Sequence, residues 1–155
     1  MAILRLTHIG ICVSDMERSL QFYCDGLGFT YLSEIHIGGW PTETLLQLKD
    51  VDLHACYLER DGIRIELLHY VSPGAAGAPH PRPMNQLGLT HLSLRVDNVA
   101  DILPDLCGAG GRVIEPSRID IPAFDAAAVF ITDPDGTLIE LVQAPGDPAL
   151  PPGAG

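Results

Sequence analysis

The sequence predicts an α+β fold in which two similar modules pair to form a curved, eight-stranded mixed sheet around a cleft. The run LTHIGICV begins at Leu6 and the run LTHLSLRV begins at Leu89, an offset of 83 residues. A second motif, Asp-Gly-x-x-Ile-Glu-Leu, starts at Asp61 and again at Asp135. Each module is expected to run strand, helix, then several strands, and one helix can cover only one face of such a sheet. Pairing of the two modules would bury the other face.

A chain of 155 residues is long enough for one domain with a sizeable core. We expect a single domain over residues 1–155, with a first module at about 3–70, a linker at 71–86, a second module at about 87–143 and a flexible tail at 144–155. The linker contains four prolines, which favour extended or turn structure over helix. The tail is rich in Pro and Gly and is expected to fray.

The first module is expected to open with a strand at 4–13, where polar and apolar residues alternate toward its end. Ser14-Asp15-Met16-Glu17 fits the S-x-x-E capping box of a helix start, and Gly26 or Gly28 is expected to end that helix. Asp61-Gly62 is typical of a hairpin turn. The other strands of this module are expected at 29–37, 44–48, 53–58 and 63–69.

The second module repeats this order, with a strand at 90–96 and a helix capped by Asp97. Gly108 and Gly110 are expected to end the helix, and Pro104 is expected to kink or shorten it because proline removes a backbone hydrogen bond. The turn at 133–136 should join the last two strands. The strands after the helix are expected at 112–114, 126–131 and 137–142.

The composition restricts the partners. The net charge is −11 with only nine basic residues, so nucleic-acid binding is not expected, and a polyanionic substrate such as a coenzyme A ester is disfavoured. No apolar run approaches the roughly 20 residues that span a bilayer. The N-terminal residues do not resemble a signal peptide, so we expect a cytoplasmic protein that does not bind membranes.

The four cysteines, at positions 12, 24, 56 and 107, are scattered and form no C-x-x-C pair. We interpret them as small buried hydrophobic residues rather than as disulfides or a zinc knuckle. A thiol ligand at Cys12 is the alternative.

Four residues at matching positions of the two modules are the candidate metal ligands: His8, Glu66, His91 and Glu140. Each histidine has a small residue two positions later on the same strand face, which leaves room for a ligand. Each glutamate interrupts an apolar strand. Any one of these residues could be an ordinary strand residue that faces solvent, but the repetition of the pattern favours a shared role.

A buried carboxylate costs several kcal/mol unless it is paired or binds a cation. Two imidazoles and two carboxylates that converge on one divalent metal would meet this requirement. Nitrogen and oxygen ligands suit Ni, Co, Zn, Mn or Fe(II). Four protein ligands in an octahedral field leave two positions for water or substrate.

The sequence resembles the vicinal oxygen chelate superfamily, which includes glyoxalase I, methylmalonyl-CoA epimerase, extradiol dioxygenases and bleomycin-resistance proteins. The resemblance covers about residues 4–143 and rests on LTHIGICVSDMERSLQFYCDGLGF, the second LTH strand and DPDGTLIEL. It implies paired βαβββ modules and, as in bacterial-type glyoxalase I, a metal bound by His8, Glu66, His91 and Glu140. It also implies a homodimer and a small substrate whose two adjacent oxygens bind the metal, which stabilises an enediolate-like anion. Glu140, with Glu66 as second choice, would be the catalytic base.

Two positions depart from glyoxalase I. That enzyme type carries an arginine four residues after the first histidine and an asparagine four residues after the first glutamate, both of which serve glutathione. This chain has Cys12 and Tyr70 there, so glutathione is not expected as co-substrate. Epimerases usually place a glutamine where this chain has Glu66.

The leading hypothesis is therefore a metal-dependent lyase or isomerase of the glyoxalase type. The first alternative is an Fe(II) ring-cleaving dioxygenase, whose two-His, one-Glu set would be His8, His91 and Glu140. The second alternative is a non-catalytic protein that sequesters a ligand, as bleomycin-resistance proteins do. Whether the metal site lies within one chain or across a dimer is left open by the sequence.

Weaker candidates lie on the strand at 53–58. His54 and Cys56 alternate with Tyr57, so one of the two strand faces is expected to line the cleft, and His54 or Tyr57 could assist in acid–base chemistry. A core or surface role is the alternative for both. A second set, in or near loops that could cover a pocket, comprises His36, Trp40, His69, Tyr70 and His80.

Overall fold

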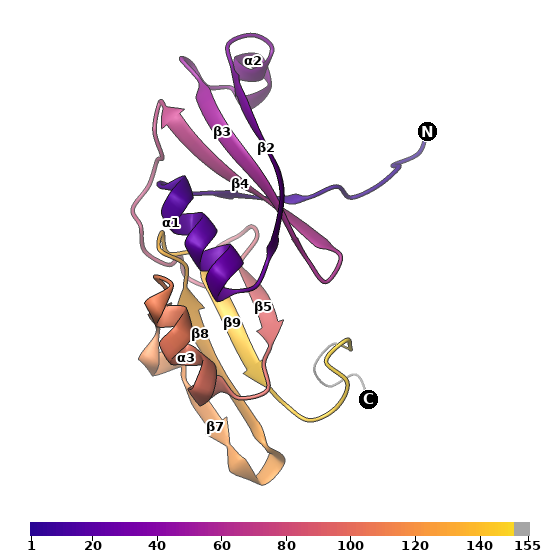
Figure 1. Ribbon diagram of the computed structural model, residues 1–155, viewed down its shortest axis with the longest axis vertical. Helices are drawn as coiled ribbons and strands as arrows, with labels where there is room; N and C mark the ends of the chain where they lie inside the picture. The colour runs from indigo at the N-terminus through magenta and orange to yellow at the C-terminus, as the bar shows by residue number, and fades with distance from the viewer. Residues whose placement is uncertain (151–155) are drawn as a thin grey trace. The chain divides into compact units, whose positions relative to one another are not determined.

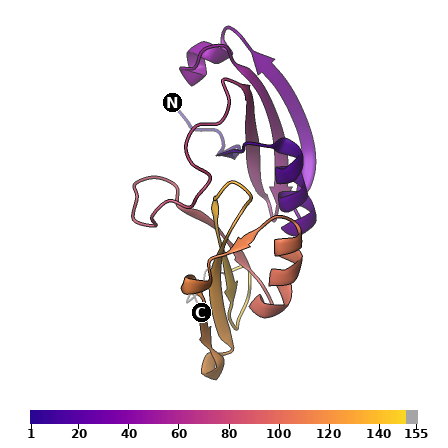
Figure 2. The same cartoon turned by 90° about the vertical axis from the view of Figure 1, so that its left-hand side faces the viewer.

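The computed structural model describes residues 1–150, and the chain divides into two compact units, one from Met1 to Ala78 and the other from Pro79 onward. Each unit contains one mixed sheet with a helix packed against it (Figure 1, Figure 2). The α+β class is confirmed, and so is the βαβββ arrangement of the modules taken one at a time. The strands form two sheets, of four and five strands, and β7 (Ile119–Ile121) is a strand that none of the expected ranges covers.

The sheet of the first unit has the strand order β1-β4-β3-β2. The first strand of the module is parallel to the last, and the other neighbours are antiparallel. Two short α-helices and a π-helical segment connect the strands. In chain order the elements are β1 (Ile9–Cys12), α1 (Met16–Leu20), η1 (Gln21–Gly26), β2 (Thr30–Gly38), α2 (Thr42–Leu46), β3 (Asp52–Arg60) and β4 (Ile63–Ser72).

The second unit repeats this topology with the order β5-β9-β8-β6, and β7 pairs with β8. Its first strand is again parallel to its last. Two single-turn 3-10 helices flank β7. In chain order the elements are β5 (His91–Arg95), α3 (Val99–Gly108), β6 (Arg112–Val113), η2 (Glu115–Ser117), β7, η3 (Pro122–Phe124), β8 (Ala126–Thr132) and β9 (Leu138–Gln143).

The core of each unit is an apolar layer contributed by its helix and its strands. In the first unit, Phe22 and Tyr23 of η1 are fully buried, as are Leu58, Ile65 and Leu67 of the strands. A second cluster under α2 contains Val51, Leu53 and Ala55. In the second unit the buried set is Val99, Leu103, Leu106, Val129, Ile131, Ile139 and Leu141.

The start of each helix differs by one residue from the sequence prediction. Asp15 is the N-cap of α1, and its carboxylate accepts a hydrogen bond from the backbone amide of Arg18 at 3.0 Å. The Ser14 hydroxyl instead accepts from the Arg18 guanidinium. In α3 the N-cap is Asn98, not Asp97, and the Asn98 side chain accepts from the Asp101 amide. In both cases the capping side chain bonds the amide three residues later, as N-caps do.

Pro104 does not shorten α3, contrary to expectation, and the helix continues to Gly108. The proline lies on the exposed side of the helix, while Leu103 and Leu106 face the core. The carbonyl that loses its partner belongs to Ala100, which is also exposed, so water can satisfy it.

Two strand predictions are wrong. Residues 44–48 are not a strand: Thr42–Leu46 form helix α2, which ends where Gln47 adopts a left-handed conformation with φ of 54°. The opening strand begins at Ile9, not at Leu4, because its pairing with β4 starts at Ile9. Leu4 and Leu6 are almost fully exposed.

The cysteines are only partly the buried residues that were expected. Cys56 is buried and Cys24 is half-buried, but Cys12 and Cys107 are exposed. Residues 73–90, all of them described, contain neither helix nor strand, so β4 extends two residues into the predicted linker at 71–86. Residues 151–155 of the expected tail lie outside the described part of the chain. Among residues 1–150, no helix is long and apolar enough to cross a membrane.

Both predicted turns are present. Asp61 and Gly62 have φ of 52° and 76°, the left-handed pair that a two-residue hairpin loop requires. The turn between β8 and β9 is organised by Asp133, which is fully buried. Its carboxylate accepts hydrogen bonds from the amides of Asp135 (3.0 Å) and Thr137 (2.8 Å).

We expect Asp133→Ala to lower the free energy of unfolding by about 2–3 kcal/mol, because it leaves two amides without their acceptor in a buried turn. Urea denaturation monitored by circular dichroism measures this loss. The exposed Asp105→Ala on α3 is the control and should change stability by less than about 0.5 kcal/mol. Equal stability of the two variants would contradict the role given to the Asp133 carboxylate.

Candidate metal centre

The first candidate pair joins the residue before β1 to the middle of β4. Because β1 and β4 are parallel neighbours, Gly10 lies opposite Glu66, and His8 reaches the same carboxylate from two residues earlier. The distance from His8 Nε2 to Glu66 Oε2 is 3.0 Å. The Glu66 side chain is only 12% exposed, so this carboxylate is one that needs a partner.

Two residues, Thr7 and Tyr57, contact this pair. The Thr7 hydroxyl lies 3.0 Å from His8 Nδ1, the ring nitrogen that faces away from Glu66. The Tyr57 ring, on the neighbouring strand β3 opposite Glu66, meets the His8 ring edge-on at 5.5 Å. Burial, followed by a hydrogen bond to Glu66 and the charge of that carboxylate, raises the pKa of Tyr57, so its phenol stays neutral.

The second candidate pair has the same construction. His91 begins β5, Glu140 lies in the parallel strand β9, and His91 Nε2 is 3.6 Å from Glu140 Oε2. The Thr90 hydroxyl lies 2.8 Å from His91 Nδ1. Phe130, opposite Glu140 on the neighbouring strand, meets the His91 ring edge-on at 5.4 Å. Thus each histidine has a threonine at Nδ1, an aromatic ring at its edge and a glutamate at Nε2.

The two pairs differ in the source of their hydroxyl donor. Glu140 accepts a hydrogen bond from Ser93 at 2.8 Å, and its neighbour Phe130 has no hydroxyl. Glu66 accepts from Tyr57, and the residue in the position of Ser93 is Gly10. A Cβ at Gly10 would lie 3.2 Å from Leu68 Cδ1, a close contact that favours glycine here.

The structure therefore brings His8 to Glu66 and His91 to Glu140. The convergence of all four side chains on one ion stays a prediction. The sequence did indicate Tyr57 and the small residues Gly10 and Ser93, although the serine hydroxyl binds Glu140 and does not merely leave space. It did not indicate Thr7, Thr90 or Phe130; the repeated Leu-Thr-His motif was the available signal for the two threonines.

The donor set is chemically suited to a divalent metal. Metal-binding histidines usually donate their second ring N–H to a fixed acceptor, which orients the ring and leaves the other nitrogen free for the ion. Thr7 and Thr90 can accept in this way at Nδ1, while Nε2 of each histidine faces a carboxylate. Nitrogen and carboxylate ligands without sulfur suit Ni, Co, Zn, Mn or Fe(II). Without an ion, the same atoms form two His–Glu ion pairs.

The two positions that depart from glyoxalase I lie near the first pair. Cys12 follows Gly10 on the same face of β1, and Tyr70 follows Glu66 and Leu68 on the same face of β4. Burial raises the pKa of Tyr70, with smaller contributions from the charges of Cys12 and Glu66. Near Glu66, the thiol of Cys12 therefore takes the place of a guanidinium, and the phenol of Tyr70 takes the place of an amide.

The remaining candidates do not join the pairs. His54 and Cys56 point to the face of β3 opposite to Tyr57, away from His8 and Glu66. His54 is thus excluded from contact with Glu66, whereas Tyr57 makes that contact. Trp40 and His80 are exposed in loops.

Comparisons with known proteins agree with this fold. A probable lactoylglutathione lyase of Synechocystis sp. is 29% identical over 146 residues, which cover 89% of this chain and 94% of that protein. The catechol-2,3-dioxygenase of Bacillus subtilis is 33% identical over 144 residues; these cover 87% of this chain but only 41% of the dioxygenase. Among solved structures, a glyoxalase family protein from Bacillus cereus matches with a TM-score of 0.77 at 18% identity, covering 94% of this chain and 97% of that one.

The sequence model of one family, described as the Glyoxalase/Bleomycin resistance protein/Dioxygenase superfamily, matches residues 5–141. This range includes both modules and all four candidate ligands. The chain therefore belongs to the glyoxalase/bleomycin resistance protein/dioxygenase superfamily, the vicinal oxygen chelate proteins.

Proposed function

We propose that this protein is a metal-dependent lyase or isomerase of the glyoxalase type, acting on a small substrate with two neighbouring oxygens. The ligands of one divalent ion per chain would be His8, Glu66, His91 and Glu140. The observation that carries the proposal is the duplicated His–Glu pair, with a threonine at Nδ1 and an aromatic edge repeated in each unit. An isolated ion pair needs none of these supports, and their repetition at two sites favours metal ligation.

A bound divalent ion would supply Lewis acidity, which polarises two adjacent substrate oxygens and acidifies the neighbouring C–H. The chain itself must supply a base for that proton. Carboxylates in such positions typically contribute 10²–10⁴-fold to the rate.

Glu140 is better suited than Glu66 to move the proton. Its side chain is 31% exposed against 12% for Glu66, and it lies 3.6 Å from its histidine against 3.0 Å. Glu140 accepts a hydrogen bond from the small Ser93 side chain, whereas Glu66 lies beside the bulky Tyr57 ring. We infer that Glu66 is the more rigid ligand and that Glu140 takes and returns the proton.

The runner-up function is an Fe(II) extradiol-type dioxygenase, favoured by the 33% identity to the Bacillus subtilis catechol-2,3-dioxygenase. Its ligands would be His8, His91 and Glu140, with Glu66 dispensable. A binding protein that only sequesters a ligand is the third candidate, and the net charge of −11 would suit a cationic one. For all three we expect a homodimer and a small-molecule ligand.

The replacement of arginine and asparagine by Cys12 and Tyr70 removes a cation and an amide from the first pair. We therefore infer a substrate without a glutathione moiety. A neutral or singly charged compound with adjacent carbonyl and hydroxyl oxygens fits the acidic chain better than a coenzyme A ester.

We expect about one nickel, cobalt, zinc or manganese ion per chain in untagged protein purified anaerobically without chelator, measured by elemental analysis. Chelation should remove both the ion and the activity on a panel of small α-hydroxycarbonyl compounds, and the metal should restore activity. Iron together with oxygen consumption on catechols would instead support the dioxygenase. Protein that contains no metal and regains none would overturn both enzymatic proposals.

The two carboxylates can be compared directly with Glu66→Gln and Glu140→Gln. For the lyase or isomerase we expect Glu140→Gln to lower kcat by about 10²–10⁴-fold, and Glu66→Gln to lower metal occupancy as well as activity. A dioxygenase should tolerate Glu66→Gln. The exposed Glu115→Gln on η2 is the control, and activity that survives both test substitutions would contradict the assigned ligand set.

The substitution Tyr57→Phe removes the hydroxyl and keeps the ring. The second pair already has a phenylalanine, Phe130, at the corresponding position. We expect Tyr57→Phe to weaken metal affinity by about 10–100-fold, because Glu66 loses a hydrogen bond that orients it. Competition with a chromophoric chelator measures the affinity. The exposed Glu115→Gln on η2 is the control, and an affinity equal to wild type in Tyr57→Phe would mean that the bond has no part in binding.

A further inference from the structure

We propose that Glu34, His54 and Cys56 of the first unit form a second metal site, for a thiolate-binding divalent ion such as Zn²⁺. The three residues lie on β2 and β3, on the sheet face opposite to Tyr57 and the His8–Glu66 pair. One ligand atom from each lies within 4.8 Å of the other two. The proposal does not depend on the function of the first site.

The distances suit a small tetrahedral ion. His54 Nε2 lies 2.7 Å from Glu34 Oε2, and Cys56 Sγ lies 3.5 Å from His54 Nε2 and 3.9 Å from Glu34 Oε2. Ligands at about 2.0–2.3 Å from a tetrahedral zinc ion are about 3.3–3.8 Å from one another. Both sulfur distances already lie close to this range. Only the N–O pair must open, by about 0.6 Å, as the ion replaces the proton that the two atoms share.

The three side chains differ in burial, from one in the core to one at the surface. Cys56 is fully buried, the His54 side chain is 19% exposed and the Glu34 side chain is 48% exposed. The soft sulfur ligand is therefore held by the core, while the carboxylate is free to move by the small distance that binding requires. Entry from solvent is open on the carboxylate side.

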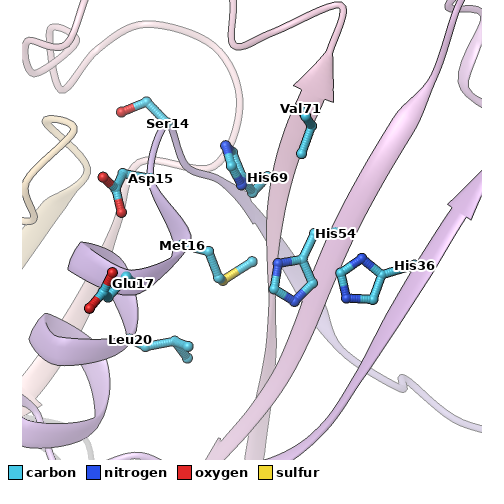
Figure 3. Close-up of a pocket in the computed structure, with 9 residues that line it drawn as sticks. All are labelled: Ser14, Asp15, Met16, Glu17, Leu20, His36, His54, His69 and Val71. Carbon is cyan, nitrogen blue, oxygen red and sulfur yellow. The ribbon is translucent and has the colours of Figure 1, made fainter.

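Two further histidines lie beside the cluster of Glu34, His54 and Cys56, at positions paired across neighbouring strands. His36 lies opposite His54, and His54 lies opposite His69, so three histidines form a row across β2, β3 and β4. The His36 and His54 rings stack at 4.1 Å with an angle of 11° between their planes (Figure 3). His36 is exposed, so its ring can rotate to supply a fourth ligand.

The row faces an open pocket of about 530 Å³ at the start of α1. Met16 of α1 extends toward His54 across this pocket, and all three histidines line it (Figure 3). The pocket gives a hydrated ion a route to His54 and room for a fourth ligand, from His36 or from water.

The competing explanation is a simple His54–Glu34 ion pair with Cys56 as a small core residue. In that case the sulfur takes no part when a metal is added. The two explanations therefore differ in one observable: only a site that includes Cys56 gives a thiolate-to-metal charge-transfer absorption. The proposed His–Glu pairs contain no sulfur, so metal bound there does not produce this signal.

The test is titration of the purified full-length protein with Co²⁺ under reducing conditions, followed by near-ultraviolet absorption. We expect a thiolate-to-cobalt band that saturates at one Co²⁺ per chain beyond the ion held at the proposed first centre, and that is displaced by Zn²⁺. The band should be absent in Cys56→Ser and unchanged in Cys107→Ser, an exposed cysteine on α3. Cys12→Ser should also retain it.

Glu34→Gln covers the case in which Cys56→Ser does not fold. It leaves the buried thiol in place and changes a half-exposed residue, so circular dichroism should match wild type. We expect the Co²⁺ affinity read from the band to fall at least about tenfold. No band at millimolar Co²⁺, a band lost in Cys12→Ser, or an affinity unchanged in Glu34→Gln would each overturn the proposal.

Discussion

The parallel pairing of the first and last strands of each unit is the constraint on which the candidate centre depends. It sets Gly10 beside Glu66 and Ser93 beside Glu140, and the preceding histidine then reaches the carboxylate of the adjacent strand. Because side chains alternate along a strand, a slip of one residue in either pairing would turn the glutamate to the opposite face. The buried leucines and isoleucines on both sides of each glutamate oppose such a slip, since it would expose them. Register, and hence the position of each ligand, is therefore fixed by the apolar core.

The features that were predictable from the sequence are those determined by short motifs. The Asp-Gly turns locate the ends of the strands that carry Glu66 and Glu140, because only a few residues tolerate their left-handed backbone. The repeated Leu-Thr-His motif locates the two histidines. Alternation along the strand that carries both His54 and Tyr57 separates the residues that can reach Glu66 from those that cannot.

The features that were missed depend on tertiary partners. The leucine-rich residues 44–48 resemble a strand, but no neighbouring strand pairs with them. Residues 44–46 belong instead to α2, with Leu46 packed against the cluster of Val51. Leu4 and Leu6 are apolar enough for a strand, yet β4 provides partners only from Ile9 onward. The short strand β7 exists because Ala126–Ala128 provide a free edge for it. The threonine contacts at Nδ1 depend on side-chain rotamers, which no spacing rule specifies.

The two modules have kept one pattern of contacts while exchanging the residue that supplies the hydroxyl, Tyr57 in one and Ser93 in the other. Glu66 consequently lies beside a phenol, and Glu140 beside a small aliphatic hydroxyl. In the proposed centre, duplication therefore yields two chemically unequal carboxylates. The two halves of the duplicated motif are therefore not interchangeable, because each glutamate has its own hydroxyl neighbour.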